Sequence, residues 1–260
     1  MRACKLLPLI AFTFASGGAG QALATAITKS LTVDVFQVCN DSGTSCASTG
    51  PSGDAYFSAE VNKIWSQAGI SVNFVFVQQI DSTFYYNIND NSGNSFTNLT
   101  KAYGTYQSAT TVDMFLVNTI VDAYGEGWLG AGGLAIAMDT VMAYNHGDGR
   151  IDTIAHELGH NLGLVPNTYN GSDGTGHTTN PVQLMASGGI RDVPATMADI
   201  APDGRNWDQI PADQISIARG SSLLRDIDVP EPESWLLLLA GIGCIAAMRR
   251  RTAPRRTLVA

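Results

Sequence analysis

Alternating and clustered apolar positions divide the first half of the chain into short strands and one helix. Residues 31–38 alternate apolar with polar side chains, and residues 70–77 and 111–121 are apolar runs rich in β-branched and aromatic residues. Such runs predict strands. Between the first two strands, apolar residues at helical spacing predict a helix that Asp54 caps and Gly69 ends. We therefore expect a sheet with a helix packed on it.

The segment that follows is less regular. Residues 87–100 are rich in Asn, Ser and Gly and predict a surface loop. Residues 124–138 begin Gly-rich and end apolar, which predicts an irregular edge strand, and residues 140–144 predict one more short strand. With a second helix after them, this order predicts an α/β (α+β) fold in one domain.

The second predicted helix has one apolar face and one face that carries two histidines. Asp148 or Asp152 can cap its start, and Gly163 can end it in the left-handed conformation. At 100° per residue, His156 and His160 lie opposite an apolar stripe that we expect to face the sheet. This stripe consists of Ile151, Ala155, Leu158 and Leu162.

The sequence patterns at both ends of the chain are typical of targeting segments. Residues 1–24 have a positively charged start, an apolar core and a small-residue cleavage site, which is typical of a secretory signal peptide. At the other end, a Pro-Glu-Pro motif at 230–232 precedes the uncharged segment Trp235–Met248 and then a cluster of arginines. These 14 uncharged residues are fewer than the roughly 20 that a stable membrane span needs.

The motif, apolar segment and basic tail of residues 230–260 resemble the PEP-CTERM sorting signal of Gram-negative bacteria. The resemblance implies that an exosortase-like enzyme cuts the chain and that the apolar segment is a transient anchor. The alternative is an ordinary C-terminal membrane anchor. Either way, we expect export to the periplasm, the cell surface or the extracellular matrix, with membrane contact only through this segment.

Residues 25–229 remain as a single domain, and we expect it to be a monomer. They contain 8 Lys and Arg against 21 Asp and Glu, and this negative charge argues against nucleic acid as a partner. Acidic composition suits Ca²⁺, but no EF-hand pattern supports a calcium site. In an oxidising compartment, Cys39 and Cys46 are spaced to close a small disulfide loop.

The histidine face of the second helix carries the candidate chemistry. His156 and His160 are four residues apart, so both imidazoles can reach one metal ion. Glu157 lies beside them and can hold a water molecule next to the metal without being a ligand. By composition alone, this spacing of two His and one Glu would arise in about one such chain in a thousand.

Two histidines do not complete a catalytic zinc site, which normally has three protein ligands. A gluzincin-type site takes a downstream Glu as its third ligand. After Glu157 the chain has only Glu231 and Glu233, both in the C-terminal motif. The gluzincin type is therefore excluded.

The remaining resemblance is to the metzincins, whose signature is matched by His156, Glu157, His160 and Gly163. Residues 184–188 look like the methionine-containing turn of that family, which would place Met185 beneath the metal. The resemblance spans about residues 30–225. It implies a twisted mixed sheet, an active-site helix, a small C-terminal subdomain after it and one catalytic Zn²⁺.

One position departs from the metzincin signature. The family's third ligand stands three residues after the glycine, where this chain has Pro166, which cannot bind a metal. We expect the chain to bulge here and to deliver His177 as the third ligand. Asp173 is the alternative, because a carboxylate oxygen also binds zinc. A third interpretation is an incomplete site in a non-catalytic relative.

With a complete site, the resemblance implies a zinc metallopeptidase that hydrolyses peptide bonds in a protein or peptide substrate, with Glu157 as general base. We expect the substrate to extend along the predicted edge strand, at Gly133, Leu134 and Ala135. The tyrosine that some metzincins add after the methionine turn is missing from residues 186–190. The alternatives are a surface or biofilm-matrix binding protein without catalysis, and a domain that acts on one dedicated partner.

Overall fold

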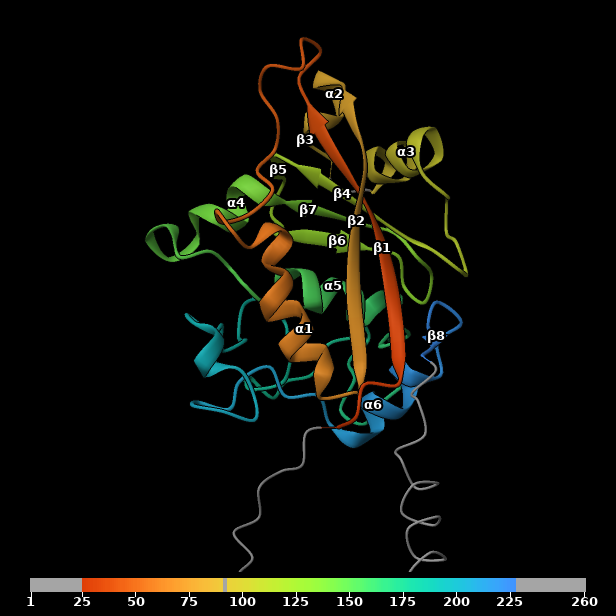
Figure 1. The fold of residues 1–260 in the computed structure, drawn as a ribbon, viewed down its shortest axis with the longest axis vertical. Coiled ribbons are helices and arrows are strands. Elements are labelled where there is room, and N and C mark those ends of the chain that lie inside the picture. The colour runs from red at the N-terminus through yellow and green to blue at the C-terminus, as the bar shows by residue number, and fades with distance from the viewer. Residues whose placement is uncertain (1–24, 91–92, 228–260) are drawn as a thin grey trace, which may run out of the picture.

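A twisted, mostly parallel sheet organises the chain (Figure 1). The computed structural model describes residues 25–90 and 93–227, so the predicted signal segment 1–24 and sorting segment 230–260 lie outside the described residues. The strand order is β2-β1-β4-β7-β6, and β8 pairs with the start of β1. These strands are β1 Lys29–Cys39, β2 Ile70–Asp81, β4 Val112–Val117, β6 Gly125–Gly127, β7 Leu134–Ala137 and β8 Arg225–Asp226.

Most strand pairs are parallel. β1 runs parallel to β2 and β4, and β4 runs parallel to β7. β6 is antiparallel to β7, and β8 is antiparallel to β1. A separate parallel pair joins β3 Asn87–Ile88 to β5 Thr119–Ile120. The mixed sheet and its helices confirm the predicted fold class.

Helices cover both faces of the sheet. α1 Ser58–Ser66 and α5 Thr153–Asn161 pack on one face, and α3 Asn94–Tyr103 lies toward the other (Figure 1). Side chains of β1 alternate between the two cores, as the period of two along a strand requires. Leu31, Val33 and Val35 join the core under α1 and α5, whereas Phe36 and Val38 join the core under α3. The remaining helices are α2 Thr83–Tyr86, α4 Met138–Ala143 and α6 Ala212–Arg219.

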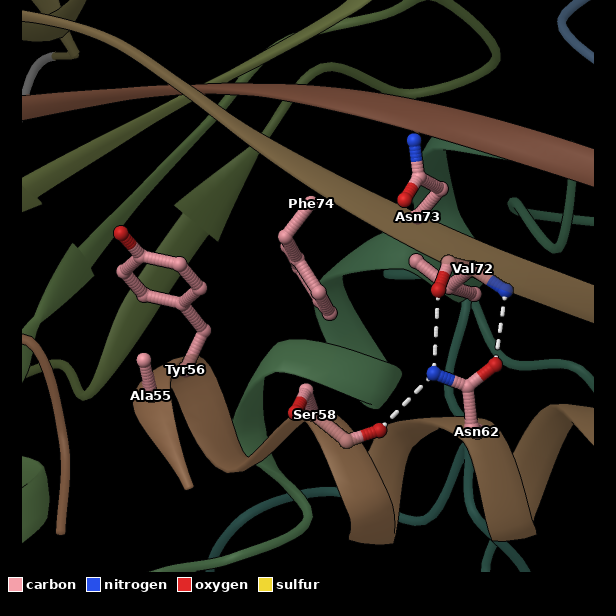
Figure 2. Close-up of a pocket in the computed structure, with 7 residues that line it drawn as sticks. All are labelled: Ala55, Tyr56, Ser58, Asn62, Val72, Asn73 and Phe74. Carbon is pink, nitrogen blue, oxygen red and sulfur yellow. Dashed lines mark hydrogen bonds between the residues drawn. The ribbon is translucent and has the colours of Figure 1, made fainter. Parts of the chain in front are cut away.

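The outer edge of β2 is partly closed by a side chain of α1. The Asn62 amide donates to the main-chain oxygen of Val72 and accepts from its N–H, at 3.0 and 2.9 Å, while also donating to Ser58 O (Figure 2). A hollow of about 320 Å³ opens beside it. Its seven lining residues include no His, Cys, Asp or Glu.

Two local predictions are wrong because apolar residues at helical spacing decide the structure. The predicted loop 87–100 contains β3 and most of α3, where Phe96 and Leu99 are buried three positions apart. Residues 140–143 of the predicted strand 140–144 lie instead in α4, which buries Met138 and Val141 at the same spacing. The histidine motif therefore lies on α5, after three more helices than the sequence indicated.

The residues predicted to bind the substrate along the edge strand do not lie at the edge of the sheet. Leu134 and Ala135 lie in β7, which pairs with β4 on one side and β6 on the other, and both are fully buried. Gly133 immediately precedes β7. The Gly-rich segment before it folds back as a hairpin, in which Trp128 N donates to Gly133 O, and supplies the additional strand β6. The antiparallel edge of the sheet is therefore β6, Gly125–Gly127.

Cys39 and Cys46 form the expected disulfide, which joins the end of β1 to the turn that follows it. None of the helices in residues 25–90 and 93–227 is long and apolar enough to cross a membrane. The apolar segment Trp235–Met248 is outside that range.

Candidate metal centre

The two histidines of the motif lie on α5, a helix that is buried along its whole length. All nine of its residues are buried, because the sheet covers one side and the chain after the helix covers the other. His156 and His160 are each 5 % exposed, and their rings meet edge to face with centroids 5.0 Å apart. The spacing of four residues thus places both imidazoles on the side of α5 turned away from the sheet.

The chain after α5 carries His177 back to these two rings. It reverses at Gly163, whose φ of +98° is in the region that favours glycine. His177 then lies beside the methionine turn, because the next residue, Thr178, donates its N–H to Met185 O at 2.9 Å. The chain therefore bulges around Pro166 and then comes back, so that His177 lies next to the two histidines of α5.

The three imidazoles converge on one point. His156, His160 and His177 each offer a ring nitrogen, and these atoms lie within 4.8 Å of one another. The Nε2 atoms of His156 and His177 are 3.2 Å apart. With Zn–N bonds of about 2.0–2.1 Å and tetrahedral angles, ligand nitrogens lie about 3.3 Å apart. The distance between the Nε2 atoms of His156 and His177 fits a single tetrahedral ion.

Hydrogen bonds hold each histidine in the tautomer that binds a metal through Nε2. The Nδ1–H groups of His156 and His160 donate to the carbonyls of Leu184 and Leu164, at 2.8 and 3.0 Å. The Nδ1–H group of His177 donates to the hydroxyl of Thr175 at 2.8 Å. The Nε2 lone pairs therefore face one another, an arrangement that is repulsive unless a cation lies between them. The donor set fits Zn²⁺.

All three rings are held in the neutral form that metal binding requires. Burial lowers the pKa of His156 well below its ordinary value, with the nearby Arg191 charge acting in the same direction. Burial lowers the pKa of His160 to about 4. The pKa of His177 is also lowered by burial, although the charge of Asp173 opposes the change.

Asp173, the alternative third ligand, builds the loop and is not a member of the histidine group. Its Oδ1 accepts the N–H groups of Thr175 and His177, at 2.8 and 2.9 Å, and the Thr175 hydroxyl at 2.7 Å. The Thr175 hydroxyl bond is the main cause that lowers the pKa of Asp173 to about 2. The carboxylate thus orients His177 through Thr175.

Met185, the methionine of the predicted methionine turn, packs against α5. It is fully buried, and its side chain packs against Gly159, which stands between His156 and His160 on α5. A Cβ at Gly159 would lie 2.5 Å from Met185 Sδ. Glycine at this position therefore allows the turn to approach the helix.

Glu157 faces a cavity of about 520 Å³ that His156 and His177 also line. Its side chain passes close to the edge strand, because a Cβ at Gly125 would lie 2.8 Å from Glu157 Cγ. Burial raises the pKa of Glu157 to about 7, although the positive charge of Arg191 opposes the change. The carboxylate lies beside the metal ligands and is not one of them.

Sequence reasoning missed a buried charge cluster at the start of α5. Arg191 forms an ion pair with Asp152, with Nε 2.7 Å from Oδ2, and donates to Leu184 O at 3.1 Å. Its Nη1 also lies against His156 Nδ1, so Leu184 O accepts from both side chains. Asp152 was expected only as a helix cap. No local pattern connects Arg191 to a helix so far from it in sequence.

Comparison with known proteins points to metallopeptidases. Residues 55–165 match the family described as "Metallo-peptidase family M12B Reprolysin-like", a range that includes His156, Glu157 and His160 and ends before His177. No curated protein matches the chain in sequence.

Several solved structures are remotely similar to this one. Mature mirolysin of Tannerella forsythia, solved with a cleaved peptide, is 12 % identical with a TM-score of 0.47, and the match covers 74 % of this chain and 90 % of that one. Metalloproteinase-II of Bacteroides fragilis is 15 % identical with a TM-score of 0.41, covering 76 % and 54 %. Archaemetzincin of Methanopyrus kandleri is 9 % identical with a TM-score of 0.39, covering 73 % and 93 %.

The family match spans the helix that holds two of the ligands, and the fold supplies the third from outside the matched range. Together, the reprolysin-like match of residues 55–165 and the three-histidine group support a metzincin-type zinc metallopeptidase.

Proposed function

We propose that this protein is an exported zinc-dependent endopeptidase, with Glu157 as the general base. One observation carries the proposal: three neutral imidazoles converge on one point next to a buried carboxylate, at a cavity large enough for a side chain. A structural zinc site would be closed by a fourth protein ligand. Here the three-histidine group has no fourth His, Cys, Asp or Glu within the described residues.

The roles of the residues follow from their positions. His156, His160 and His177 would hold Zn²⁺, which when bound lowers the pKa of a water molecule and polarises the scissile carbonyl. Glu157 accepts a proton from the attacking water and returns it to the leaving amine. Arg191 keeps Leu184 O, and through it the His156 ring, in place.

We further propose that the substrate adds to β6, the antiparallel edge strand, in place of the buried β7. β6 lies against α5, and its glycines at 125 and 127 leave room beside Glu157. An extended peptide on this edge would place its main chain next to the carboxylate.

Export is proposed from the signal-like residues 1–24, with processing by an exosortase-like enzyme proposed from residues 230–260. The Cys39–Cys46 disulfide is consistent with an oxidising compartment. Fractionation of a Gram-negative host that expresses the full chain, followed by mass measurement of both termini, would test both parts. A mature protein that starts at Met1 and stays in the cytoplasm would contradict them.

The catalytic proposal is tested by Glu157→Gln. We expect the purified wild-type domain to hold about one zinc and to cleave casein. Because Glu157 is not a ligand, the variant should keep its zinc and lose activity by at least about 10²-fold, within the range that general base catalysis contributes. Zinc content by atomic absorption and cleavage of a labelled casein are the two measurements.

Glu60→Gln is the matched control, since it removes a half-buried carboxylate from α1, on an element that contributes no metal ligand. Its activity should equal that of the wild type. Full activity in Glu157→Gln would remove Glu157 from the mechanism. A wild type that holds zinc and cleaves no protein would favour the non-catalytic binding protein instead.

A further inference from the structure

The cavity beside Glu157 is lined by two buried arginines. One wall comes from the start of α5 and the start of β6, and the other from residues 187–189, which follow the methionine turn. Arg150 and Arg191 also line it, and they are only 4 % and 8 % exposed. Arginine is rarely buried to this extent unless its charge is paired.

The guanidinium of Arg150 has few strong partners. The hydrogen bond from its Nη2 to Gly188 O is long at 3.4 Å, and its Nε lies 3.5 Å from Asp152 Oδ1. The guanidinium carbon lies 4.6 Å from the ring centre of Tyr124 and 5.7 Å from that of Tyr144. Two aromatic rings thus hold the guanidinium in position without using its N–H donors.

The two buried arginines share one closely placed carboxylate. Asp152 lies between Arg150 and Arg191 and pairs more closely with Arg191. Glu157 also lines the cavity, but its carboxylate serves the proposed proton transfer. Asp122 lies at the mouth, where it is exposed and its charge is screened by water. Arg150 is therefore the less closely paired of the two buried cations.

Strand direction decides which substrate residue reaches the arginines. β6 runs from Gly125 to Gly127, so a peptide that adds antiparallel to it ends its course near Gly125. The cavity opens at Tyr124 and Gly125, at the start of β6. In that orientation, the substrate residue that enters the cavity would be on the C-terminal side of the cleaved bond.

Building on the proposed peptidase function, we propose that Arg150, supported by Arg191, forms a pocket for an acidic side chain. The enzyme would then cleave preferentially before Asp or Glu. The carboxylate would accept charge-assisted hydrogen bonds from the unused donors of Arg150. Gly188 leaves the guanidinium accessible, since a Cβ there would lie 3.6 Å from Arg150 Nη1 and 3.7 Å from Nη2.

The test uses three peptides that differ only in the residue after the cleaved bond, which is Glu, Gln or Lys. For the zinc-loaded wild type, we expect kcat/KM for the Glu peptide to exceed that for Gln by about tenfold or more. The Lys peptide should be the poorest. Arg150→Gln should reduce the Glu-to-Gln ratio to near one, and because both peptides are measured with the same variant, a general loss of activity does not affect the ratio.

Gly188→Ala provides a second variant that leaves all charges in place. Its Cβ would make an ordinary van der Waals contact with the guanidinium, so the protein should fold, and the added methyl should lower the Glu-to-Gln ratio by partly covering Arg150. Equal cleavage of all three peptides by the wild type, or an unchanged ratio in Arg150→Gln, would overturn the pocket.

A binding measurement can distinguish a failure of the acidic pocket from a failure of the proposed peptidase function. Calorimetry of the same peptides with zinc-loaded Glu157→Gln measures the pocket without cleavage. Tighter binding of the Glu peptide, together with a zinc-loaded wild type that cleaves none of the three peptides, would keep the pocket and reject the peptidase. Cleavage without an acidic preference in either measurement would keep the peptidase and reject the pocket.

Discussion

At the scale of single residues, the site depends on what each histidine does with its second nitrogen. His156 and His160 donate to main-chain carbonyls, which move only if the backbone moves. His177 donates instead to the Thr175 hydroxyl, which in turn donates to Asp173. The third ligand is thus held by side chains of its own loop, and substitutions there should alter its orientation without disturbing α5.

Thr175→Val should weaken zinc binding by about 10–100-fold, because it removes the acceptor that fixes the His177 tautomer. Competition with a chelator measures the affinity. Ser172→Ala is the control in the same loop, since the Ser172 hydroxyl donates to the carbonyls of Val165 and Asp173 and not to a histidine of the site. Equal affinity in Thr175→Val and Ser172→Ala would show that the hydroxyl does not position the ligand.

At the scale of elements, α5 can hold its histidines in fixed positions because other segments pack against it on all sides. The sheet covers its apolar stripe, the methionine turn covers Gly159, and Asn161 ties it to the β6–β7 hairpin by donating to Trp128 O and Gly133 O at 2.9 and 3.1 Å. The helix therefore fixes the position of the metal ligands and of the proposed substrate strand at once.

Gly159→Ala tests the fit between α5 and the methionine turn. The added Cβ would lie 2.5 Å from Met185 Sδ, so a fully buried side chain must move. We expect a loss of about 1–3 kcal/mol in the free energy of unfolding, typical of an overpacked core, even though alanine favours helix. Urea unfolding of the apo protein measures it.

Met185→Ala supplies the matching control for that experiment. It removes the atoms that the new methyl would meet, so the Gly159→Ala/Met185→Ala protein should be more stable than the sum of the two single changes predicts. Additive losses would show that the turn and the helix are not in contact as the structure has them.

How much of these elements the sequence revealed depends on how local their signals are. β1, β2 and α5 were predicted because their apolar periodicity is complete within one segment. α3 was missed because polar Asn and Ser residues mask the two apolar positions that the sheet buries. β6 was missed because its residues are mostly glycine, and only its pairing with β7 makes it a strand.

At the scale of the whole molecule, burial couples stability to pH. Glu60 on α1 is half-buried, and burial, followed by its hydrogen bond to Asp54, raises its pKa from 4.5 to about 7. The folded protein therefore binds more protons than the unfolded chain between these two values. The contribution of this group to the free energy of unfolding falls as pH rises from about 4.5 through about 7.

Glu60→Gln should remove this part of the pH dependence, because the amide does not titrate. Urea unfolding at pH 5 and pH 8 gives two free energies for each protein. We expect the wild type to lose more stability than the variant between the two, with other titrating groups common to both. A difference of the same size in both proteins would show that the Glu60 carboxyl keeps its ordinary pKa when folded.

The sequence by itself determined the helix with His156, Glu157 and His160, the choice of His177 over other histidines as third ligand, and the disulfide. These depend on fixed spacing or on how few such residues the chain has. The tertiary structure decided between His177 and Asp173, moved the edge strand from β7 to β6, and gathered Arg150 and Arg191 at the cavity. Those outcomes depend on where distant segments pack, which no local periodicity encodes.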